Sequence, residues 1–403
     1  MGSVCLYADS VFIYDKATGY ADVVKNKKSN VYTQYRIGSI SKMFTAVMML
    51  QLIEEKKISL DAKLSQYFPG IKNSSKITIE QLLNHRSGIE NFTNEADYTS
   101  YMEKPQTPEQ LIAIFEKLPS DFEPGSQFSY SNTNYVLLTF IIEKITKSSY
   151  AEQLIRRICA RAMLADTRVG GKINTNSNEA QSYNFAQGRW AATTETDLSV
   201  ACGAGNIIST SKDLCLFIAA LFEGKLISQT MLGKMKTMRD GYGLGMVQFP
   251  FGERKFYGHT GGIDNFQSML AYNEADKTAV CITGNGFDYS INEIAIALLS
   301  VHYGLPFTLP DFEKKVDRAF AANSPEGIYG NGKTGMKITV FKEKDQMMAQ
   351  ATGQQAFPLT AISEYEYKFD LAGIRILFMK NEAGDLMQFK LTQGGKDLLF
   401  SRE

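Results

Sequence analysis

Two copies of the spacing Ser-x-x-Lys supply residues that can do chemistry, Ser39 with Lys42 and Ser209 with Lys212. Residues three apart on a helix face the same side, so the lysine amine can reach the serine hydroxyl. A lysine whose pKa is lowered by burial can take the hydroxyl proton and make the serine a nucleophile. The amides of a first helical turn also stabilise the negative charge that develops. The spacing therefore indicates acyl transfer through a serine.

The two copies stand in different local sequence. Ser39 opens a mostly apolar stretch that continues to Ile53, which predicts a helix that starts near Ser39 and is buried over most of its surface. A lysine in that helix would be desolvated. Around Ser209, Thr210 and Asp213 have the spacing of a capping box, which indicates a helix N-terminus with a structural role. We therefore take the first copy as the candidate pair.

Two further motifs supply partners for this pair. Tyr130-Ser131-Asn132 leads into a helical pattern, where the phenol can shuttle protons and the amide can bind substrate. His259-Thr260-Gly261-Gly262 stands at the start of an apparent strand, along whose edge a ligand backbone can lie because glycine is small. Alone, each motif is better explained by structure, as a tyrosine packed in a turn or a histidine at a strand end. Together and in this order, the three motifs predict one catalytic site.

The order Ser-x-x-Lys, Tyr-x-Asn, His-Thr-Gly resembles the serine β-lactamase-like family of penicillin-recognising hydrolases, which includes class C β-lactamases, D-alanyl-D-alanine carboxypeptidases and esterases. The resemblance covers about residues 3–305 and extends to the segment 203–210. It implies that Ser39 is the acylated nucleophile, Lys42 its base partner and Tyr130 the proton shuttle to the leaving group. It also implies an oxyanion hole made by the backbone amides of Ser39 and Gly262, and substrate binding by Asn132, His259, Thr260 and Gly261.

The motifs depart from those of class C β-lactamases, which have Tyr-Ala-Asn and Lys-Thr-Gly. The pairing here is closer to the D,D-peptidases, so the resemblance implies a D-alanyl-D-alanine carboxypeptidase-like or D-amino-acid peptide hydrolase. A β-lactamase, a small-ester esterase and a non-catalytic penicillin-recognising sensor remain as alternatives. The substrate expected is a small molecule or peptide: a D-amino-acid peptide, a β-lactam or an ester. Because His259 need not be charged at pH 7, we expect a histidine-like pH dependence.

The elements that position these motifs form an α+β pattern. A hairpin at 4–14 comes first, and β-runs at 266–272 and 278–283 follow much later, with a helix at 291–301 closing the unit. Between them lie helical patterns at 78–85, 107–118, 132–146, 150–163 and 211–222. We predict an antiparallel sheet flanked by helices, with an all-helical insertion, over residues 1–310. Beyond a charged bridge at 311–318, alternating runs predict a small all-β, barrel-like domain over residues 320–403.

Composition narrows the classes of partner. The 403 residues carry 43 basic and 43 acidic side chains, so no charge excess favours nucleic acid. Apolar runs such as 43–50 are far shorter than the roughly 20 residues that span a bilayer, so no membrane span is expected.

The five cysteines are scattered and indicate neither a disulfide scaffold nor a zinc site, and we expect no metal or cofactor. The stretch 327–334 matches a phosphate-loop pattern, but a strand-like run follows it where a helix would be needed.

The remaining expectations concern the location of the protein and the walls of its substrate pocket. The first residues lack the pattern of a signal peptide, and we expect residues upstream to be missing. The family resemblance implies a periplasmic or cell-envelope location. The walls of the substrate pocket are expected from the loops at 91–107 and 184–196, the second of which contains Trp190.

Overall fold

The computed structural model describes residues 1–95, 97–186, 188–287, 289, 291–307, 325–332, 337–343, 346–351, 357–369, 374–393 and 396–403. These residues group into two compact units, residues 1–249 with 255–289 and residues 250–254 with 290–403. The charged bridge predicted at 311–318 lies outside the described residues. The domain boundaries at 310 and 320 fall in the same gap, and they remain predictions.

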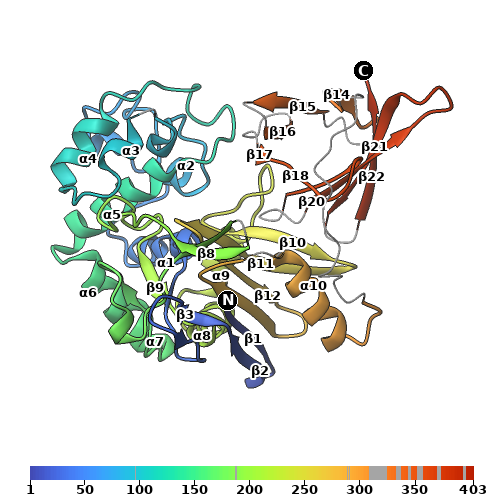
Figure 1. The fold of residues 1–403 in the computed structure, drawn as a ribbon. Coiled ribbons are helices and arrows are strands. Elements are labelled where there is room, and N and C mark those ends of the chain that lie inside the picture. The colour runs from blue at the N-terminus through green and yellow to red at the C-terminus, as the bar shows by residue number, and fades with distance from the viewer. Residues whose placement is uncertain are drawn as a thin grey trace. The chain divides into compact units, whose positions relative to one another are not determined.

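A six-stranded sheet forms the framework of the first unit (Figure 1). The N-terminal hairpin, β1 (Gly2–Ala8) and β2 (Val11–Thr18), joins the later strands because β1 pairs antiparallel with β13. The order across the sheet is β10-β11-β12-β13-β1-β2. The later strands are β10 (Val247–Phe251), β11 (Arg254–Ile263), β12 (Phe266–Asn273) and β13 (Thr278–Gly284).

Helix α1 (Ser41–Glu54) is the buried helix predicted after Ser39. Its residues 41–52 are all buried, which explains why the stretch is apolar on every side instead of amphipathic. It packs against α5 (Asn132–Thr146), and its Phe44 ring stacks on Phe217 of α8 (Ser211–Phe222) with centroids 3.8 Å apart. Helix α8 in turn lies on strands β1, β12 and β13. This packing fixes α1 between the sheet-bound α8 and the other helices.

The insertion between β5 (Tyr35–Arg36) and β6 (Arg168–Val169) is helical, as predicted. Helices α2, α3 and α4 gather on one side of α5 (Figure 1). Their bounds, and those of the next helices, are α2 (Ile79–Leu83), α3 (Tyr98–Tyr101), α4 (Pro108–Phe115), α6 (Tyr150–Leu154), α7 (Ala160–Ala162) and α9 (Gln229–Met235). A π-helical turn, Ile155–Cys159, joins α6 to α7.

Short strands that the sequence analysis did not predict fasten the ends of the insertion. β5 and β6 both pair with β9 (Ile207–Ser209). The remaining pairs are β3 (Tyr20–Asp22) with β4 (Lys27–Lys28), and β7 (Tyr183–Ala186) with β8 (Arg189–Ala192). Strands of two to four residues are too short to leave a periodic pattern, so alternation could not reveal them.

The second unit contains a nine-stranded antiparallel sheet that is nearly closed, as the barrel-like prediction required (Figure 1). The order is β17-β16-β15-β14-β22-β21-β20-β19-β18, and its two edge strands are separated in the chain by Leu359 alone. The strands are β14 (Gly327–Gly330), β15 (Lys337–Glu343), β16 (Gln346–Ala351), β17 (Phe357–Pro358), β18 (Thr360–Ala361), β19 (Glu366–Phe369), β20 (Ile374–Lys380), β21 (Leu386–Gln393) and β22 (Lys396–Arg402).

Helix α10 (Ile291–His302) is present where the sequence predicts it, but it groups with the second unit. Glu293 of this helix forms an ion pair with Arg375 of β20. The prediction that this helix closes the hydrolase unit stays a prediction. Across the described residues, no helix has both the length and the apolar character that crossing a membrane requires.

Replacement of Phe44 tests the packing of α1. Phe44→Ala removes a fully buried ring and leaves a cavity against α8, so we expect a loss of about 3–5 kcal/mol in unfolding free energy. Trp190, the only tryptophan of the chain, lies on β8 in the first unit and reports its unfolding in urea by fluorescence. Val24→Ala, at a side chain 82% exposed, should change the value by less than about 0.5 kcal/mol. Equal losses in both variants would contradict this packing.

Candidate active site

Ser39 lies on the 3-10 turn, Gly38–Ile40, that leads directly into α1. Gly38 has a φ of +49°, and a Cβ atom there would stand 2.6 Å from the backbone nitrogen of Gly262. A Cβ atom at Gly261 would stand only 2.0 Å from the carbonyl oxygen of the residue two positions before Ser39. Glycine alone allows this approach, which explains Gly38 and the first glycine of the His-Thr-Gly-Gly motif.

The Lys42 amine is enclosed by three oxygen atoms. Its Nζ lies 3.0 Å from Ser39 Oγ, 2.7 Å from Asn132 Oδ1 and 2.9 Å from the carbonyl oxygen of Ala204. The side chain is fully buried, and burial lowers the pKa of Lys42 well below its usual value. A neutral amine has two protons, which it donates to the two carbonyl oxygens because these can only accept. Its lone pair then faces the Ser39 hydroxyl.

Tyr130 and Asn132 reach the same groups from the start of α5. The Tyr130 hydroxyl donates to Ser39 Oγ at 2.8 Å. Burial raises the pKa of Tyr130, more than the hydrogen bond with Ser39 lowers it, so the phenol keeps its proton at neutral pH. The Asn132 backbone nitrogen donates to Asn91 Oδ1 at 3.0 Å, and its side-chain Nδ2 donates to Thr93 Oγ1 at 3.2 Å. These contacts orient the Asn132 amide with its oxygen towards the amine.

His259 is buried, and its two ring nitrogens have different partners. Nε2 lies 3.0 Å from the Tyr242 hydroxyl, and Nδ1 contacts the carbonyl oxygen of Thr260. A carbonyl oxygen can only accept, so Nδ1 carries the proton and Tyr242 donates to Nε2. Burial, and next the positive charge that Lys42 carries once it is protonated at low pH, lower the pKa of His259 to about 4. The imidazole is therefore neutral at pH 7.

Two expectations about His259 change with this geometry. The residue lies within β11 and not at the start of a strand. The expected pH dependence also shifts to lower pH, because a group whose pKa is about 4 titrates well below the usual range of histidine. The physical reason is burial, which depends on tertiary neighbours that local sequence does not reveal.

Two buried aromatic residues that were not among the candidate site residues, His85 and Tyr242, hold the motifs in place. His85 accepts through Nδ1 from the backbone nitrogen of Ser131 at 3.1 Å, and its ring lies 4.3 Å from Tyr130 and 4.7 Å from Tyr242. Burial lowers the pKa of His85, which keeps the ring a neutral acceptor. No motif spacing links His85 or Tyr242 to the three candidate motifs. The glycines on either side of Tyr242 are the one signal in the sequence that could have marked this contact.

The second Ser-x-x-Lys copy is a helix cap, as predicted. Thr210 is the N-cap of α8, and its Oγ1 accepts from the backbone nitrogen of Asp213 at 3.1 Å. The Ser209 hydroxyl pairs with Thr167 Oγ1 at 2.8 Å, whereas the Lys212 amine lies over an aromatic ring. The serine and lysine of this copy therefore have different partners.

A cavity of about 500 Å³ opens beside Ser39. Both predicted wall segments contribute to it, the first through Phe92, Thr93, Tyr98 and Met102, the second through Thr193, Thr194 and Thr196. The remaining lining residues are Asn132, Ala201, Ala204, Gly205, Gly262, Ile263, Asp264 and Asn265. Trp190 packs on Phe185, with ring centroids 4.8 Å apart, and is not part of the described lining. Neither are Tyr130, His259, Thr260 and Gly261.

Two features define the class of this protein as an α+β hydrolase of the penicillin-recognising type. One is the six-stranded sheet with its helical insertion, and the other is the cluster of the Ser39 hydroxyl, the Lys42 amine and the Tyr130 phenol. The beta-lactamase family model matches residues 2–300. The chain belongs to that family, and the resemblance inferred from the three motifs is confirmed.

Individual relatives cover much of the chain. Penicillin-binding protein 4* of Bacillus subtilis (strain 168) is 24% identical over 413 aligned residues, which span 94% of this chain and 90% of the relative. Teichoic acid D-alanine hydrolase of Staphylococcus aureus is 27% identical over 70% of this chain and 72% of its own length. The crystal structure of D-amino acid amidase from Ochrobactrum anthropi SV3, complexed with L-phenylalanine amide, has a TM-score of 0.62 and is 28% identical. It covers 71% of this chain and 86% of that one.

Stability should fall at acid pH because of His259. Its pKa is about 4 in the folded protein and about 6.5 in the unfolded chain, so the unfolded chain binds more protons between these values. We expect the unfolding free energy to decrease as pH falls from about 6.5 to 4, by up to about 1.4 kcal/mol per pH unit. Urea unfolding followed by Trp190 fluorescence measures this slope.

The matched variant is His259→Asn, which removes the titrating group and keeps a polar side chain. Its slope in this pH range should be smaller by roughly one proton, while the two profiles should run parallel above pH 7. The same slope in both proteins below pH 6.5 would contradict the assignment.

Proposed function

We propose that this protein is a serine acyl-enzyme hydrolase that acts on D-amino-acid amides, esters or peptides, with Ser39 as the acylated nucleophile. The observation that carries the proposal is the pair of contacts on Ser39 Oγ, 3.0 Å to an amine of lowered pKa and 2.8 Å to a protonated phenol. One group is arranged to take a proton from the serine and the other to give one. A binding protein without catalysis has no need of a buried lysine in this state.

In the acylation step, Ser39 Oγ attacks the carbonyl carbon of the substrate while its proton passes to the Lys42 lone pair. The lowered pKa of Lys42 makes the amine a base at neutral pH. Tyr130, whose hydroxyl also contacts Ser39 Oγ, relays a proton to the leaving group as the tetrahedral intermediate collapses. Hydrolysis of the acyl-enzyme then uses the same groups in reverse, with water as the nucleophile.

The backbone amides of Ser39 and Gly262 are the proposed oxyanion hole. Support comes from the close approach of Gly38 to the Gly262 nitrogen and from the fact that Ser39 and Gly262 both line the cavity. Two amides aimed at the developing oxyanion in a site shielded from water are worth several kcal/mol of transition-state stabilisation.

The substrate class is supported by the relatives. One is a D-amino acid amidase and another a teichoic acid D-alanine hydrolase, and both names describe release of a D-amino-acid unit. Asn132 is the proposed contact for a substrate amide because it lines the cavity and is held by Asn91 and Thr93. The roles of His259, Thr260 and Gly261 in substrate binding remain predictions, with the edge of β11 as the proposed binding surface.

Replacement of Ser39 tests the nucleophile. Ser39→Ala should abolish hydrolysis of a D-alanyl 4-nitrophenyl ester and the mass increase left by a reporter penicillin, because no acyl acceptor remains. Intact-protein mass spectrometry and release of 4-nitrophenol are the measurements. Ser209→Ala is the matched control, since it removes the serine of the second Ser-x-x-Lys copy and should retain both signals. An adduct that persists in Ser39→Ala would refute the assignment.

Replacement of Tyr130 tests the proton relay. Tyr130→Phe keeps the ring and removes the hydroxyl, so kcat for an amide substrate should fall by about 10²–10⁴-fold. An ester with a 4-nitrophenol leaving group needs less protonation on departure, and its loss should be smaller. Steady-state kinetics on both substrates measure the difference. Equal losses on amide and ester would argue against a relay to the leaving group.

A further inference from the structure

The sheet carries a row of small buried residues on the face where the Ser39 turn lies. Direct partners on neighbouring strands point to the same face of a sheet. The row runs across β11, β12, β13 and β1, and its members are Gly261, Ser268, Thr283 and Ser3. All four are buried. Hydroxyls and a glycine, in place of large apolar side chains, leave room for another segment of the chain to lie on these strands.

Ser268 uses this room to hold the segment that leads into Ser39. Its Oγ donates to the carbonyl oxygen of Ile37 at 2.8 Å. The same carbonyl oxygen accepts from the backbone nitrogen of Ile40 at 3.3 Å, which closes the turn around Ser39. The Ser268 hydroxyl therefore binds the backbone group on which the nucleophile turn is built.

Gly261 makes this hydrogen bond possible. A Cβ atom at Gly261 would stand 2.4 Å from Ser268 Oγ and 2.0 Å from the Ile37 carbonyl oxygen. Donor and acceptor thus meet in the space that any larger side chain at this position would fill. The first glycine of the third motif and the Ser268 hydroxyl are parts of one contact.

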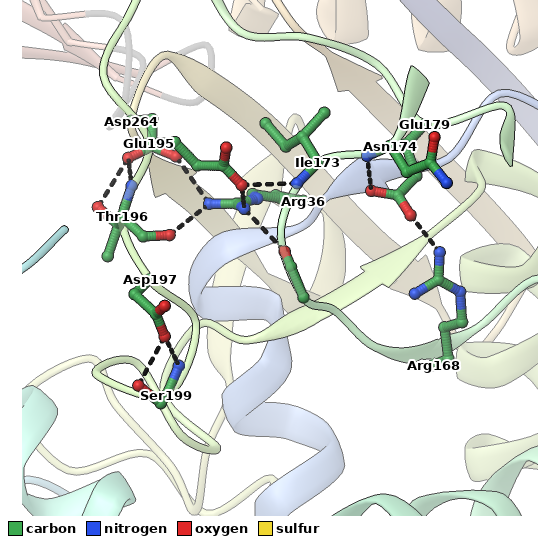
Figure 2. A network of polar contacts seen from close by, with 11 residues as sticks. Arg36, Arg168, Ile173, Asn174, Glu179, Glu195, Thr196, Asp197, Ser199 and Asp264 are labelled. Atoms are coloured by element: carbon green, nitrogen blue, oxygen red, sulfur yellow. Dashed lines mark hydrogen bonds and ion pairs between the residues drawn. The ribbon is translucent and has the colours of Figure 1, made fainter. Parts of the chain in front are cut away.

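Asp264 supplies a second contact at the other end of the same hairpin. It lies in the two-residue turn between β11 and β12, and its Oδ2 is 3.1 Å from NH1 of the buried Arg36 (Figure 2). Its Oδ1 accepts from the backbone nitrogen and the hydroxyl of Thr196 at 3.0 and 2.7 Å. The carboxylate is 1% exposed, so its partners belong to the protein and it is not open to a ligand.

Gly262 lies between these two contacts. The hairpin is held at the pair Gly261–Ser268 and again at its turn, and Gly262 belongs to the next pair towards that turn. Both contacts are made to consecutive residues, 36–37, and Ser39 follows two positions later. The two amides proposed for the oxyanion hole are therefore each within a few residues of the same fixed points.

We propose that Ser268 and Asp264 are positioning residues for the oxyanion hole. Through the segment 36–37 they hold the Gly262 amide at a fixed separation from that of Ser39, and neither needs to touch the reacting atoms. The inference rests on the proposed function, of which the oxyanion hole is a part. Donors stabilise a transition state only when they are aimed at the place where charge develops, and a misplacement of 1 Å can cost about 10²-fold in rate.

Kinetics of Ser268→Ala test the first contact. For D-alanine 4-nitroanilide, kcat should fall about 10–10²-fold. KM should change less than about twofold, because the oxyanion hole acts on the transition state more than on bound substrate. Rates are referred to the fraction of protein that a reporter penicillin acylates at completion, so misfolded protein does not count.

Thr283→Val is the matched control. Thr283 is the neighbour of Ser268 in the same buried row, but its Oγ1 has no hydrogen-bond partner among the described residues. The exchange of hydroxyl for methyl keeps the side-chain shape, and both kinetic constants should stay within about twofold. An unaltered kcat in Ser268→Ala, or equal losses in the two variants, would overturn the inference.

A boronic acid distinguishes positioning from a general structural effect. The Ser39 hydroxyl adds to boron and gives its proton to Lys42, and the tetrahedral boronate places an oxygen where the oxyanion would form. Because such analogues follow the transition state, the inhibition constant of phenylboronic acid should rise in Ser268→Ala by about the factor lost in kcat. A loss in kcat with unaltered boronate affinity would contradict the positioning role.

Asp264→Asn tests the second contact with the same two readouts. It keeps the size of the side chain and weakens the pairing with Arg36, so kcat and boronate affinity should fall together while KM is kept. Glu179→Gln is its control, since it removes a carboxylate that pairs with Arg168 outside the described cavity lining (Figure 2). Equal effects of Asp264→Asn and Glu179→Gln would refute the role of Asp264.

Hydrogen exchange separates this inference from the proposed function. Mass spectrometry of the segments 36–41 and 260–264 reports how firmly the two backbones are held, without any chemistry. Exchange there should be faster in Ser268→Ala and unchanged in Thr283→Val. No turnover and no adduct in the unaltered protein would overturn the hydrolase proposal, and exchange would still decide whether Ser268 holds the turn. Turnover with unaltered exchange in Ser268→Ala would overturn the positioning role alone.

Discussion

Burial of one amine is the constraint on which the rest of this structure depends. The Lys42 amine lies at the centre of the first unit, where full ionisation would leave a charge without a carboxylate partner. The fold meets that cost with oxygen acceptors from three different parts of the chain: the Ser39 turn, the start of α5 and the segment around Ala204. Each acceptor also fixes one component of the proposed acyl-transfer site. Stability of the buried amine and arrangement of the site are thus the same set of contacts.

Close contact between the backbone of the Ser39 turn and that of β11 is the second constraint on the structure. Glycines at 38 and 261 let the turn that carries Ser39 lie directly against β11, so two amides can converge where an oxyanion would form. Arg36, just before that turn, reaches across to the β11–β12 turn through Asp264 and to the cavity wall through the Thr196 carbonyl (Figure 2). The buried Arg36 guanidinium therefore joins the strand before Ser39 to the β11–β12 turn and to the cavity wall at Thr196. A conservative change to lysine would lose this multiple contact, because an ammonium lacks the planar fork.

The charge state of the third motif depends on where its histidine lies in the fold. A histidine in place of a lysine in the third motif already weakens the positive charge there, because an exposed histidine is only partly protonated near pH 7. Once buried beside Lys42, His259 is neutral at pH 7, so the third motif adds no fixed positive charge to the site.

Sequence alone determined the three candidate motifs, the buried helix after Ser39 and the β-rich C-terminal unit, because these depend on local spacing and periodicity. It also separated the two Ser-x-x-Lys copies, since a helix cap is a local pattern. It could not reveal that His259 is buried within a strand, that His85 and Tyr242 pack on the motifs, or that Arg36 serves two carboxylates. These contacts join residues up to 228 positions apart. Only tertiary structure decides them, because burial and charge pairing are properties of neighbours in space.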